Sequence, residues 1–154
     1  MDQAAMQVFM DYAAAFEQTY VDDDWSRLLP FFAEDATYHV VGGPLACEIA
    51  GREAILKGLK KSIDGLDRRC DERVIDLIDG PHVNSTPGGH AIDIGWTASY
   101  RRGDSPMLVF PGRSVVTVEQ GRIVALQDEY TDEDMRTLEP WMEKYGADLD
   151  GSYV

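Results

Sequence analysis

The chain has 154 residues, of which 44% are hydrophobic and 27% charged, and this composition is typical of one globular domain rather than a disordered or fibrous protein. Its 28 Asp and Glu residues outnumber its 14 Lys and Arg residues, so the formal net charge is −14. A surface of this charge repels the phosphates of nucleic acids and of anionic bilayers. The composition therefore argues against nucleic acid or a membrane as a partner, and it identifies no substrate.

The N-terminal segment and the cysteine content favour a cytoplasmic protein. Residues 1–20 lack the basic start and unbroken apolar stretch of a signal peptide, and no later segment has the pattern of a transmembrane helix. Cys47 and Cys70 are too few and too far apart for a disulfide framework or a zinc site. We expect both cysteines to be reduced.

Two helices are predicted in the N-terminal part of the chain. An apolar stripe with spacings of three and four predicts a helix over residues 3–20. The stripe consists of Met6, Phe9, Ala13, Phe16 and Tyr20. Three acids at 22–24 then offer an N-cap for a second helix that ends near Ala33. Pro30 predicts that this second helix is short, kinked or partly 3₁₀.

A short strand over residues 36–40, a loop that leads to Gly51 and a third helix are expected next. Apolar residues at helical spacing mark this third helix: Ile55, Leu59, Ile63 and Leu66. Turn residues at positions 42–44 open the loop between strand and helix.

From residue 69 onward the apolar period changes to two, which predicts four long strands. The predicted strands span residues 69–79, 91–102, 107–119 and 122–130, with turns over 80–89 and 103–106. The second of these strands has one apolar face, formed by Ile94, Trp96, Ala98 and Tyr100. A helix over residues 132–145 completes a single domain of residues 1–146, and residues 147–154 are expected to form a C-terminal tail.

Three segments carry a family resemblance. FFAEDATYHVVGG and the following AGREAI resemble the second-helix, first-strand and third-helix region of SnoaL-like proteins, and GRIVALQDEY is similar to their last strand. This group lies in the nuclear transport factor 2-like superfamily with polyketide cyclases, ketosteroid isomerases, scytalone dehydratase and limonene epoxide hydrolase. The resemblance covers about residues 5–132. It implies an α+β fold, in which a cone-shaped, curved antiparallel sheet wraps around helices, as in the cystatin-like α+β roll.

The catalytic residues of these relatives are matched only in part. The general-base Asp of ketosteroid isomerases falls at Val40, and the Arg-x-Asp pair of limonene epoxide hydrolase falls in residues 97–101, which contain no carboxylate. The two tyrosines of scytalone dehydratase match Tyr20 and Tyr38. The late-strand Asp that serves polyketide cyclases as general acid and base matches Asp128.

Asp128 is the leading catalytic candidate. Alternation along the last strand places it on one face with Val124, Leu126 and Tyr130, so its carboxylate is expected to project into an apolar cavity. Desolvation there would raise its pKa towards neutrality and suit it to proton transfer. The alternative is an Asp at a strand end, paired with one of three arginines: Arg101, Arg102 or Arg113.

Tyr38 and Tyr20 complete the expected catalytic set, because their hydroxyls can donate hydrogen bonds to a substrate carbonyl and stabilise an enolate. The alternative for each is a core tyrosine. The residues expected to bind substrate are Trp96, Arg113, Trp25, Val40, Leu126 and Tyr100. For the two tryptophans, filling of the core is the alternative to lining a cavity.

No cofactor or metal is expected. The sequence has no Gly-rich phosphate loop, nucleotide fingerprint or flavin motif. His39 is predicted to point away from the Tyr38 face, and His90-x-x-Asp93 divides its side chains between two faces of a strand.

The sequence thus predicts a small protein that binds an apolar or aromatic carbonyl ligand and dimerises through the outer face of its sheet. As an enzyme it would be a cofactor-free lyase or isomerase, namely a cyclase, isomerase or dehydratase for a cyclic or polyketide-like carbonyl compound. The alternative is a noncatalytic ligand-binding or assembly module of the same fold.

Overall fold

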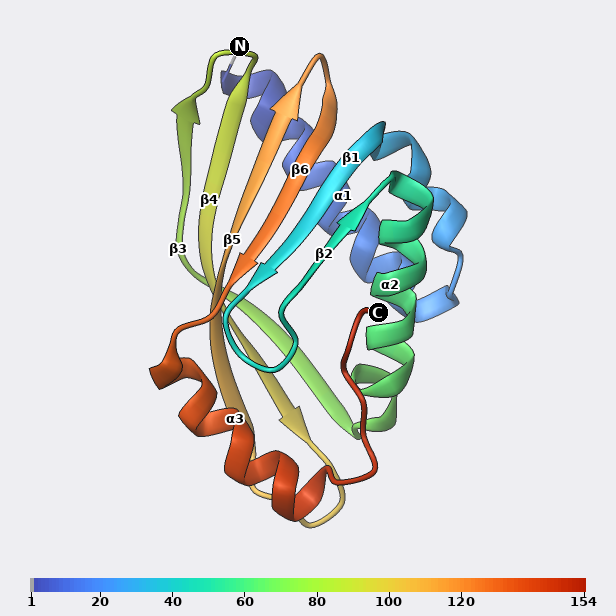
Figure 1. Ribbon diagram of the computed structural model, residues 1–154, viewed down its shortest axis with the longest axis vertical. Helices are drawn as coiled ribbons and strands as arrows, with labels where there is room; N and C mark the ends of the chain where they lie inside the picture. The colour runs from blue at the N-terminus through green and yellow to red at the C-terminus, as the bar shows by residue number, and fades with distance from the viewer. Residues whose placement is uncertain (1) are drawn as a thin grey trace.

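The computed structural model describes residues 2–154 and has the expected α+β architecture, with a six-stranded curved sheet (Figure 1). The strands are β1 (Phe32–Val41), β2 (Cys47–Ala50), β3 (Glu72–Ser85), β4 (His90–Arg101), β5 (Leu108–Glu119) and β6 (Arg122–Glu129). The helices are α1 (Asp2–Asp22), α2 (Arg52–Gly65) and α3 (Asp132–Tyr145), with two 3₁₀ turns, η1 (Trp25–Phe31) and η2 (Asp67–Arg69). None of the helices in residues 2–154 is long and apolar enough to cross a membrane.

The strand order in the sheet is β2-β1-β6-β5-β4-β3. All neighbours are antiparallel except β1 and β6, which run parallel. The parallel pair brings the first and last long strands together, so residues 37–41 lie beside residues 125–129. This pairing places Tyr38 and Asp128, which are 90 positions apart in sequence, on the same part of the sheet.

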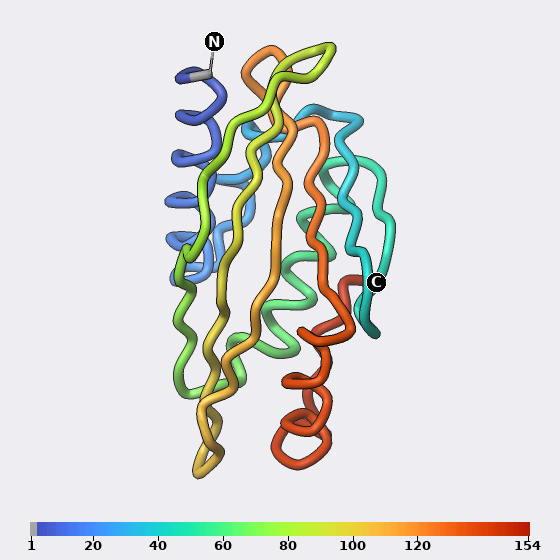
Figure 2. The backbone as a smooth tube through the Cα atoms, turned by 90° about the vertical axis from the view of Figure 1, so that its left-hand side faces the viewer, coloured from blue at the N-terminus to red at the C-terminus, as the bar shows by residue number. Residues whose placement is uncertain are grey.

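The helices enclose the concave side of the sheet. Helix α1 packs against β4 and β5, α2 packs against β1 and β2, and α3 packs against β5 near the other end of the molecule (Figures 1 and 2). Two groups of buried apolar residues result, a large one under α1 and α2 and a smaller one under α3. The amphipathic stripe of α1 faces inward as predicted, since Phe9 is buried and Phe16 packs against the first group.

Several element boundaries differ from those expected. The predicted loop before Gly51 contains β2, whose residues pair with β1 from Thr37 to Val40. Strand β3 continues to Ser85, through a segment expected to be a turn. Register shifts flank Asp79 in β3. An edge strand accommodates Gly80 and Pro81 at such bulges because its outer side has no neighbour.

The short element around Pro30 is a 3₁₀ helix, as predicted, but it ends at Phe31. Phe32 belongs to β1 and is fully buried. The β5–β6 hairpin also has a register shift between Thr117 and Val118. Because of this shift Ile123, and not Val124, joins the buried core.

The C-terminal residues fold back along α2. Ser62 Oγ donates to the carbonyl oxygen of Gly151 at 2.5 Å, and the backbone N–H of Asp150 donates to the carbonyl oxygen of Gly65 at 3.0 Å. A Cβ on Gly65 would lie 1.8 Å from the Asp150 carbonyl oxygen, so a glycine is needed for this approach. The segment thus adds a wall to the interior of the cone.

Candidate functional site

A cavity of about 460 Å³ lies between the concave face of the sheet, α1, α2 and the C-terminal segment. Its walls are mainly apolar and aromatic: Phe9, Tyr12, Ala13, Phe16, Tyr38, Leu45, Leu59, Ile63, Leu66, Ile75, Leu77, Ile94, Trp96, Ala98, Tyr100, Phe110, Val116, Leu126, Tyr130, Leu138 and Tyr153. Its polar side chains are Glu17, Ser62, Asp67, Arg73, Ser114 and Asp128. The cavity is within the size range of small-molecule sites, about 300–1,000 Å³.

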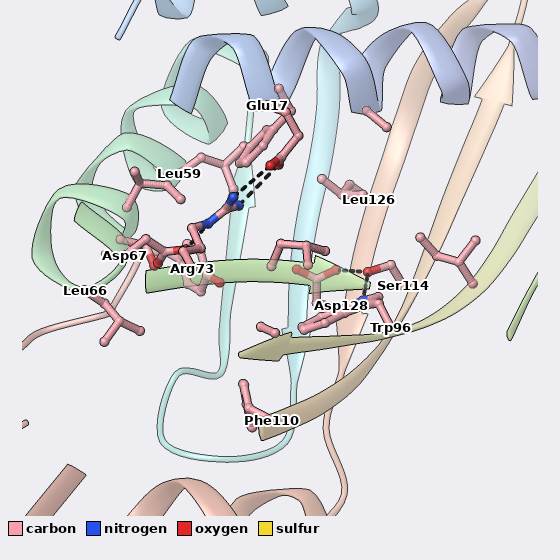
Figure 3. Close-up of a pocket in the computed structure, with 18 of the residues that line it drawn as sticks. Glu17, Leu59, Leu66, Asp67, Arg73, Trp96, Phe110, Ser114, Leu126 and Asp128 are labelled. Atoms are coloured by element: carbon pink, nitrogen blue, oxygen red, sulfur yellow. Dashed lines mark hydrogen bonds and ion pairs between the residues drawn. The ribbon is translucent and has the colours of Figure 1, made fainter. Parts of the chain in front are cut away.

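Asp128 is held by two hydroxyl groups. Tyr38 Oη donates to its Oδ2 at 2.5 Å, and Ser114 Oγ donates to its Oδ1 at 2.5 Å. Trp96 Nε1 in turn donates to Ser114 Oγ at 2.9 Å, as the close-up of the cavity shows (Figure 3). Four strands therefore fix one carboxyl group in a single orientation.

The sheet register explains this geometry. Ser114 on β5 lies directly opposite Asp128 on β6, so their side chains share one face. Trp96 on β4 lies opposite Gly112 on β5. A Cβ on Gly112 would lie 2.6 Å from the Trp96 ring, so the glycine leaves room for the indole to cover β5 and reach Ser114.

Burial raises the pKa of Asp128, and the hydrogen bonds from Ser114 and Tyr38 act in the opposite direction without cancelling it. Burial also raises the pKa of Tyr38 well above its usual value, and the neighbouring Asp128 adds to the effect. Tyr38 consequently keeps its proton near neutral pH, and Asp128 holds its proton to a higher pH than an exposed aspartate does.

Tyr153 brings the C-terminal segment to the same group. Its ring meets that of Tyr38 edge-on, with centroids 5.2 Å apart. Burial raises the pKa of the Tyr153 hydroxyl, Asp128 adds to this, and hydrogen bonding with Tyr38 and Ser62 opposes it. The polar end of the cavity around Asp128 is therefore closed by a residue from beyond the expected domain boundary.

A second polar group occupies another part of the wall. Arg73 Nε donates to Asp67 Oδ2 at 2.8 Å, and Arg73 Nη1 donates to Glu17 Oε1 at 2.8 Å (Figure 3). Tyr100 Oη also donates to Asp67 Oδ2, at 3.1 Å. Burial raises the pKa of Asp67, while Arg73 and the hydrogen bond from Tyr100 favour its ionised form.

Five of the expected site residues line the cavity: Asp128, Tyr38, Trp96, Leu126 and Tyr100. Within residues 2–154 Asp128 makes no ion pair with any of the three arginines that were expected as alternatives: Arg102 binds Asp148, Arg101 binds Glu72 and Arg113 binds Asp93. Trp96 both lines the cavity and donates a hydrogen bond within the Asp128 group.

Four expected residues lie outside the cavity lining. Arg113 points to the outer face of the sheet, where it pairs with Asp93 at 2.6 Å and with Asp79 at 3.1 Å. Its place on β5 explains this, because it is adjacent to the inward-facing Ser114 and successive strand residues face opposite sides. Val40 is buried in the core under α2.

Trp25 and Tyr20 lie near the C-terminal end of α1, and neither is among the residues that line the cavity. The Trp25 ring meets Phe16 edge-on, and its Nε1 donates to Asp23 Oδ1 at 2.7 Å. The Tyr20 ring stacks under Arg73, whose Cζ is 4.2 Å from the ring centroid, and its hydroxyl donates to the backbone oxygen of Asp67 at 3.4 Å. Tyr20 thus supports the second polar group and does not contact Asp128.

The sequence did not predict roles for Ser114, Tyr153 or the Arg73 group. Alternation in β5 separates Ser114 from Arg113, but only the register of the β5–β6 hairpin shows that it faces Asp128. Arg73 and Asp67 flank the start of β3, and Glu17 comes from α1. No local pattern joins these three residues, because their contact depends on how α1 crosses the sheet.

Comparison with known protein families gives one match, in which the SnoaL-like domain covers residues 12–126. The chain belongs to the SnoaL-like domain family. The membership of this family that the three sequence segments predicted is therefore confirmed. Comparison with curated proteins gave no match.

Solved structures share the cone fold of this SnoaL-like chain. Bal32a, from a soil-derived mobile gene cassette, is 22% identical, covers 84% of this chain and 90% of its own, and has a TM-score of 0.59. SalBIII, an epoxide hydrolase/cyclase-like enzyme of pyran ring formation in the polyether salinomycin, is 18% identical over 86% of this chain and 94% of its own, with a TM-score of 0.59. A putative polyketide cyclase from Pseudomonas putida KT2440 is 16% identical over 80% of this chain and 92% of its own, with a TM-score of 0.51.

Proposed function

We propose that this SnoaL-like protein is a cofactor-independent acid/base enzyme of the cyclase, isomerase or dehydratase type. Its substrate is a small cyclic or polyketide-like carbonyl compound that fills the apolar cavity. The observation that carries the proposal is the Asp128 carboxyl, which borders this cavity between two hydroxyl donors and has a pKa raised by burial. A carboxyl group in such surroundings holds its proton to a higher pH than an exposed one does, which suits it to transfer a proton to and from a ligand.

In the proposed reaction, ionised Asp128 removes a proton from the carbon next to the substrate carbonyl. The C–H bond breaks, its electron pair moves to the carbonyl oxygen, and an enolate forms. Protonated Asp128 then donates a hydrogen bond to Tyr38 Oη, so the Tyr38 O–H is free to donate a hydrogen bond to the enolate oxygen, and the abstracted proton stays on Asp128. Asp128 finally returns its proton to another carbon or to a departing hydroxyl group, so the carboxylate is regenerated.

The structural neighbours support the chemistry of this proposal by analogy of fold only, because cones of this kind serve several reactions. A putative polyketide cyclase and an epoxide hydrolase/cyclase-like enzyme are among them. Both names refer to small organic substrates, in agreement with the apolar lining around Asp128.

One observation favours the alternative of a noncatalytic binding module. Both carboxylate oxygens of Asp128 already accept a hydrogen bond, from Tyr38 and from Ser114. A carboxyl group with both oxygens occupied can serve to hold strands together around a passive ligand pocket.

Deuterium exchange distinguishes these functions. A cyclic ketone such as 2-tetralone is incubated with the protein in D₂O, and loss of the proton signal next to the carbonyl is followed by NMR. The catalytic proposal predicts exchange that is fast in the wild type, absent in Asp128→Asn and retained in Asp93→Asn, a matched carboxylate on the outer face. Binding without exchange would favour the noncatalytic module, and exchange that survives Asp128→Asn would remove Asp128 from the mechanism.

We also propose that the protein is cytoplasmic and forms a homodimer through the outer face of the sheet. Val74 and Val109 flank Ser99 on this face and are 46% and 48% exposed. Exposed apolar side chains that are neighbours on a sheet face are typical of surfaces that another chain covers. Light scattering should give twice the monomer mass for the wild type and the monomer mass for Val109→Glu; a monomeric wild type would reject the dimer.

A further inference from the structure

The cavity contains a second polar group that the proposed proton transfer does not use. It consists of Arg73 on β3, Glu17 on α1 and Asp67 at the start of η2, and all three line the cavity. The side chains of Arg73 and Asp67 are only 7% and 8% exposed. Figure 3 shows this group on the opposite side of the cavity from Asp128 and Ser114.

The group is an unusual choice for a purely structural contact. Burying an ion pair costs desolvation energy that apolar side chains of similar volume avoid. Leu59 and Leu66 lie in the same wall, so apolar packing is available there. The charges of Arg73 and Asp67 can act on whatever fills the cavity, because these two side chains are weakly screened by water.

Arg73 retains hydrogen-bonding capacity. Its bonds within residues 2–154 use three of its five N–H groups: Nε to Asp67, and one N–H from each terminal nitrogen to Glu17. The Tyr20 ring stacks on the guanidinium, with Arg73 Cζ 4.2 Å from the ring centroid. Tyr100 Oη donates to Asp67 Oδ2 at 3.1 Å and so fixes the carboxylate of Asp67. Tyr20 and Tyr100 therefore hold the guanidinium and the carboxylate of the group in place.

The charges of the group define the ligand atom that it suits. Two carboxylates against one guanidinium give the ionised cluster a charge of −1, and the whole chain carries −14. An anionic ligand group would be repelled. A neutral hydroxyl fits, since it donates to a carboxylate oxygen and accepts from a guanidinium N–H at the same time.

We infer that Glu17, Arg73 and Asp67 form a second binding site, which holds a hydroxyl group on the end of the ligand remote from its carbonyl. This inference rests on the proposed function and narrows its substrate class. The substrate is a cyclic or polyketide-like ketone with a second oxygen, carried as a free hydroxyl on the far side of the molecule.

Calorimetric titration with two probes tests the inference. The probes are 1-tetralone, with a carbonyl only, and 6-hydroxy-1-tetralone, which adds a hydroxyl on the far ring. The wild type should bind the hydroxylated probe about tenfold more tightly or better, as expected for a hydrogen bond to charged groups. In Arg73→Met this preference should vanish, while the affinity for 1-tetralone stays at the wild-type value and shows that the cavity is intact.

Arg27→Met is the matched control, because Arg27 forms a two-fold contact with Asp22 away from the cavity lining. It should keep the preference for the hydroxylated probe. If Arg73→Met does not fold, Glu17→Gln replaces it, since Glu17 is half exposed and keeps its size. Equal affinities of the wild type for both probes, or a preference that survives in the Arg73 or Glu17 variant, would overturn the second site alone. Failure of both probes to bind the wild type would overturn the proposed function and the second site with it.

Discussion

The two polar ends of the cavity each contain an aspartate whose pKa is raised by burial, but the partners of these aspartates differ. Asp128 accepts hydrogen bonds from uncharged hydroxyls, whereas Asp67 binds the guanidinium of Arg73. Burial raises the pKa of both carboxyls. Only at Asp67 does a neighbouring cation favour the ionised form. The charge of the partner therefore separates a group suited to transfer protons from a group suited to hold a ligand.

The largest expected effect of this difference is on proton transfer. Asp128→Asn keeps the size of the side chain and removes its ability to exchange a proton, so the rate of ketone deuterium exchange should fall by about 10²–10⁴-fold. Ligand affinity should change little. Asp67→Asn should weaken binding of a hydroxylated ketone and retain most of the exchange rate at saturating ligand. Equal loss of exchange in both variants, measured by NMR in D₂O, would show that the two ends do not differ in this way.

The next effect is on stability. Arg73→Met leaves Asp67 buried without its cation, so the free energy of unfolding should fall by about 3 kcal/mol. Ser114→Ala removes an uncharged partner of Asp128 and should cost about 1 kcal/mol. Urea denaturation followed by circular dichroism measures both. A cost for Arg73→Met no larger than that for Ser114→Ala would contradict the assigned charge state of the Asp67 end.

Tyr38→Phe changes the Asp128 end alone. The Tyr38 hydrogen bond opposes the effect of burial on Asp128, so its loss should raise the pKa of Asp128 further. The midpoint of the pH–rate profile for deuterium exchange should move to higher pH. The maximal rate should fall by about 10²-fold, because the enolate loses its hydrogen-bond donor.

Tyr145→Phe is a suitable control for this variant, because Tyr145 lies on α3 and its ring contacts Trp141. Its pH–rate profile should match that of the wild type. A Tyr38→Phe midpoint that stays in place, or moves to lower pH, would mean that the hydroxyl does not favour the ionised form of Asp128.

The smallest effect concerns the pH dependence of stability. The folded-state pKa of Asp128 is above the value of about 4 in the unfolded chain, so ionisation is disfavoured in the folded protein. The wild type therefore loses stability as the pH rises from about 4 through the folded-state pKa. Asp128→Asn lacks this loss. Across this pH window its free energy of unfolding should therefore rise relative to that of the wild type; a difference that is constant with pH would contradict the raised pKa.

Local periodicity is enough to predict most of the fold. The stripe that contains Phe9 and Phe16 identifies α1, and the alternation that contains Trp96 and Tyr100 identifies β4. Strand β2 escapes prediction because four residues after a Gly-rich turn carry too little pattern, and it exists through its pairing with β1. The extension of β3 beyond Asp79 likewise depends on pairing with β4 across two register shifts.

The candidate site is predictable where one strand presents it and not where several elements meet. Alternation in β6 places Leu126 and Asp128 on the cavity face, although a bulge removes Val124 from that face. Arg113 has the residue type of a ligand-binding group. The face of the sheet to which it points depends on the pairing register of β5, which cannot be predicted from the sequence. Tyr153 lies in a segment without periodicity, and its place beside Tyr38 results from the docking of the chain end on α2.

The ionisation of Asp128 can be followed in the folded protein by carbon-13 NMR of the labelled carboxyl groups, with Asp128→Asn identifying its signal. If Asp128 is the group that transfers the proton, its signal should titrate with a midpoint above the value of about 4 that is usual for aspartate. A midpoint at or below about 4 would leave Asp128 ionised throughout the neutral range and would contradict its role as general acid and base.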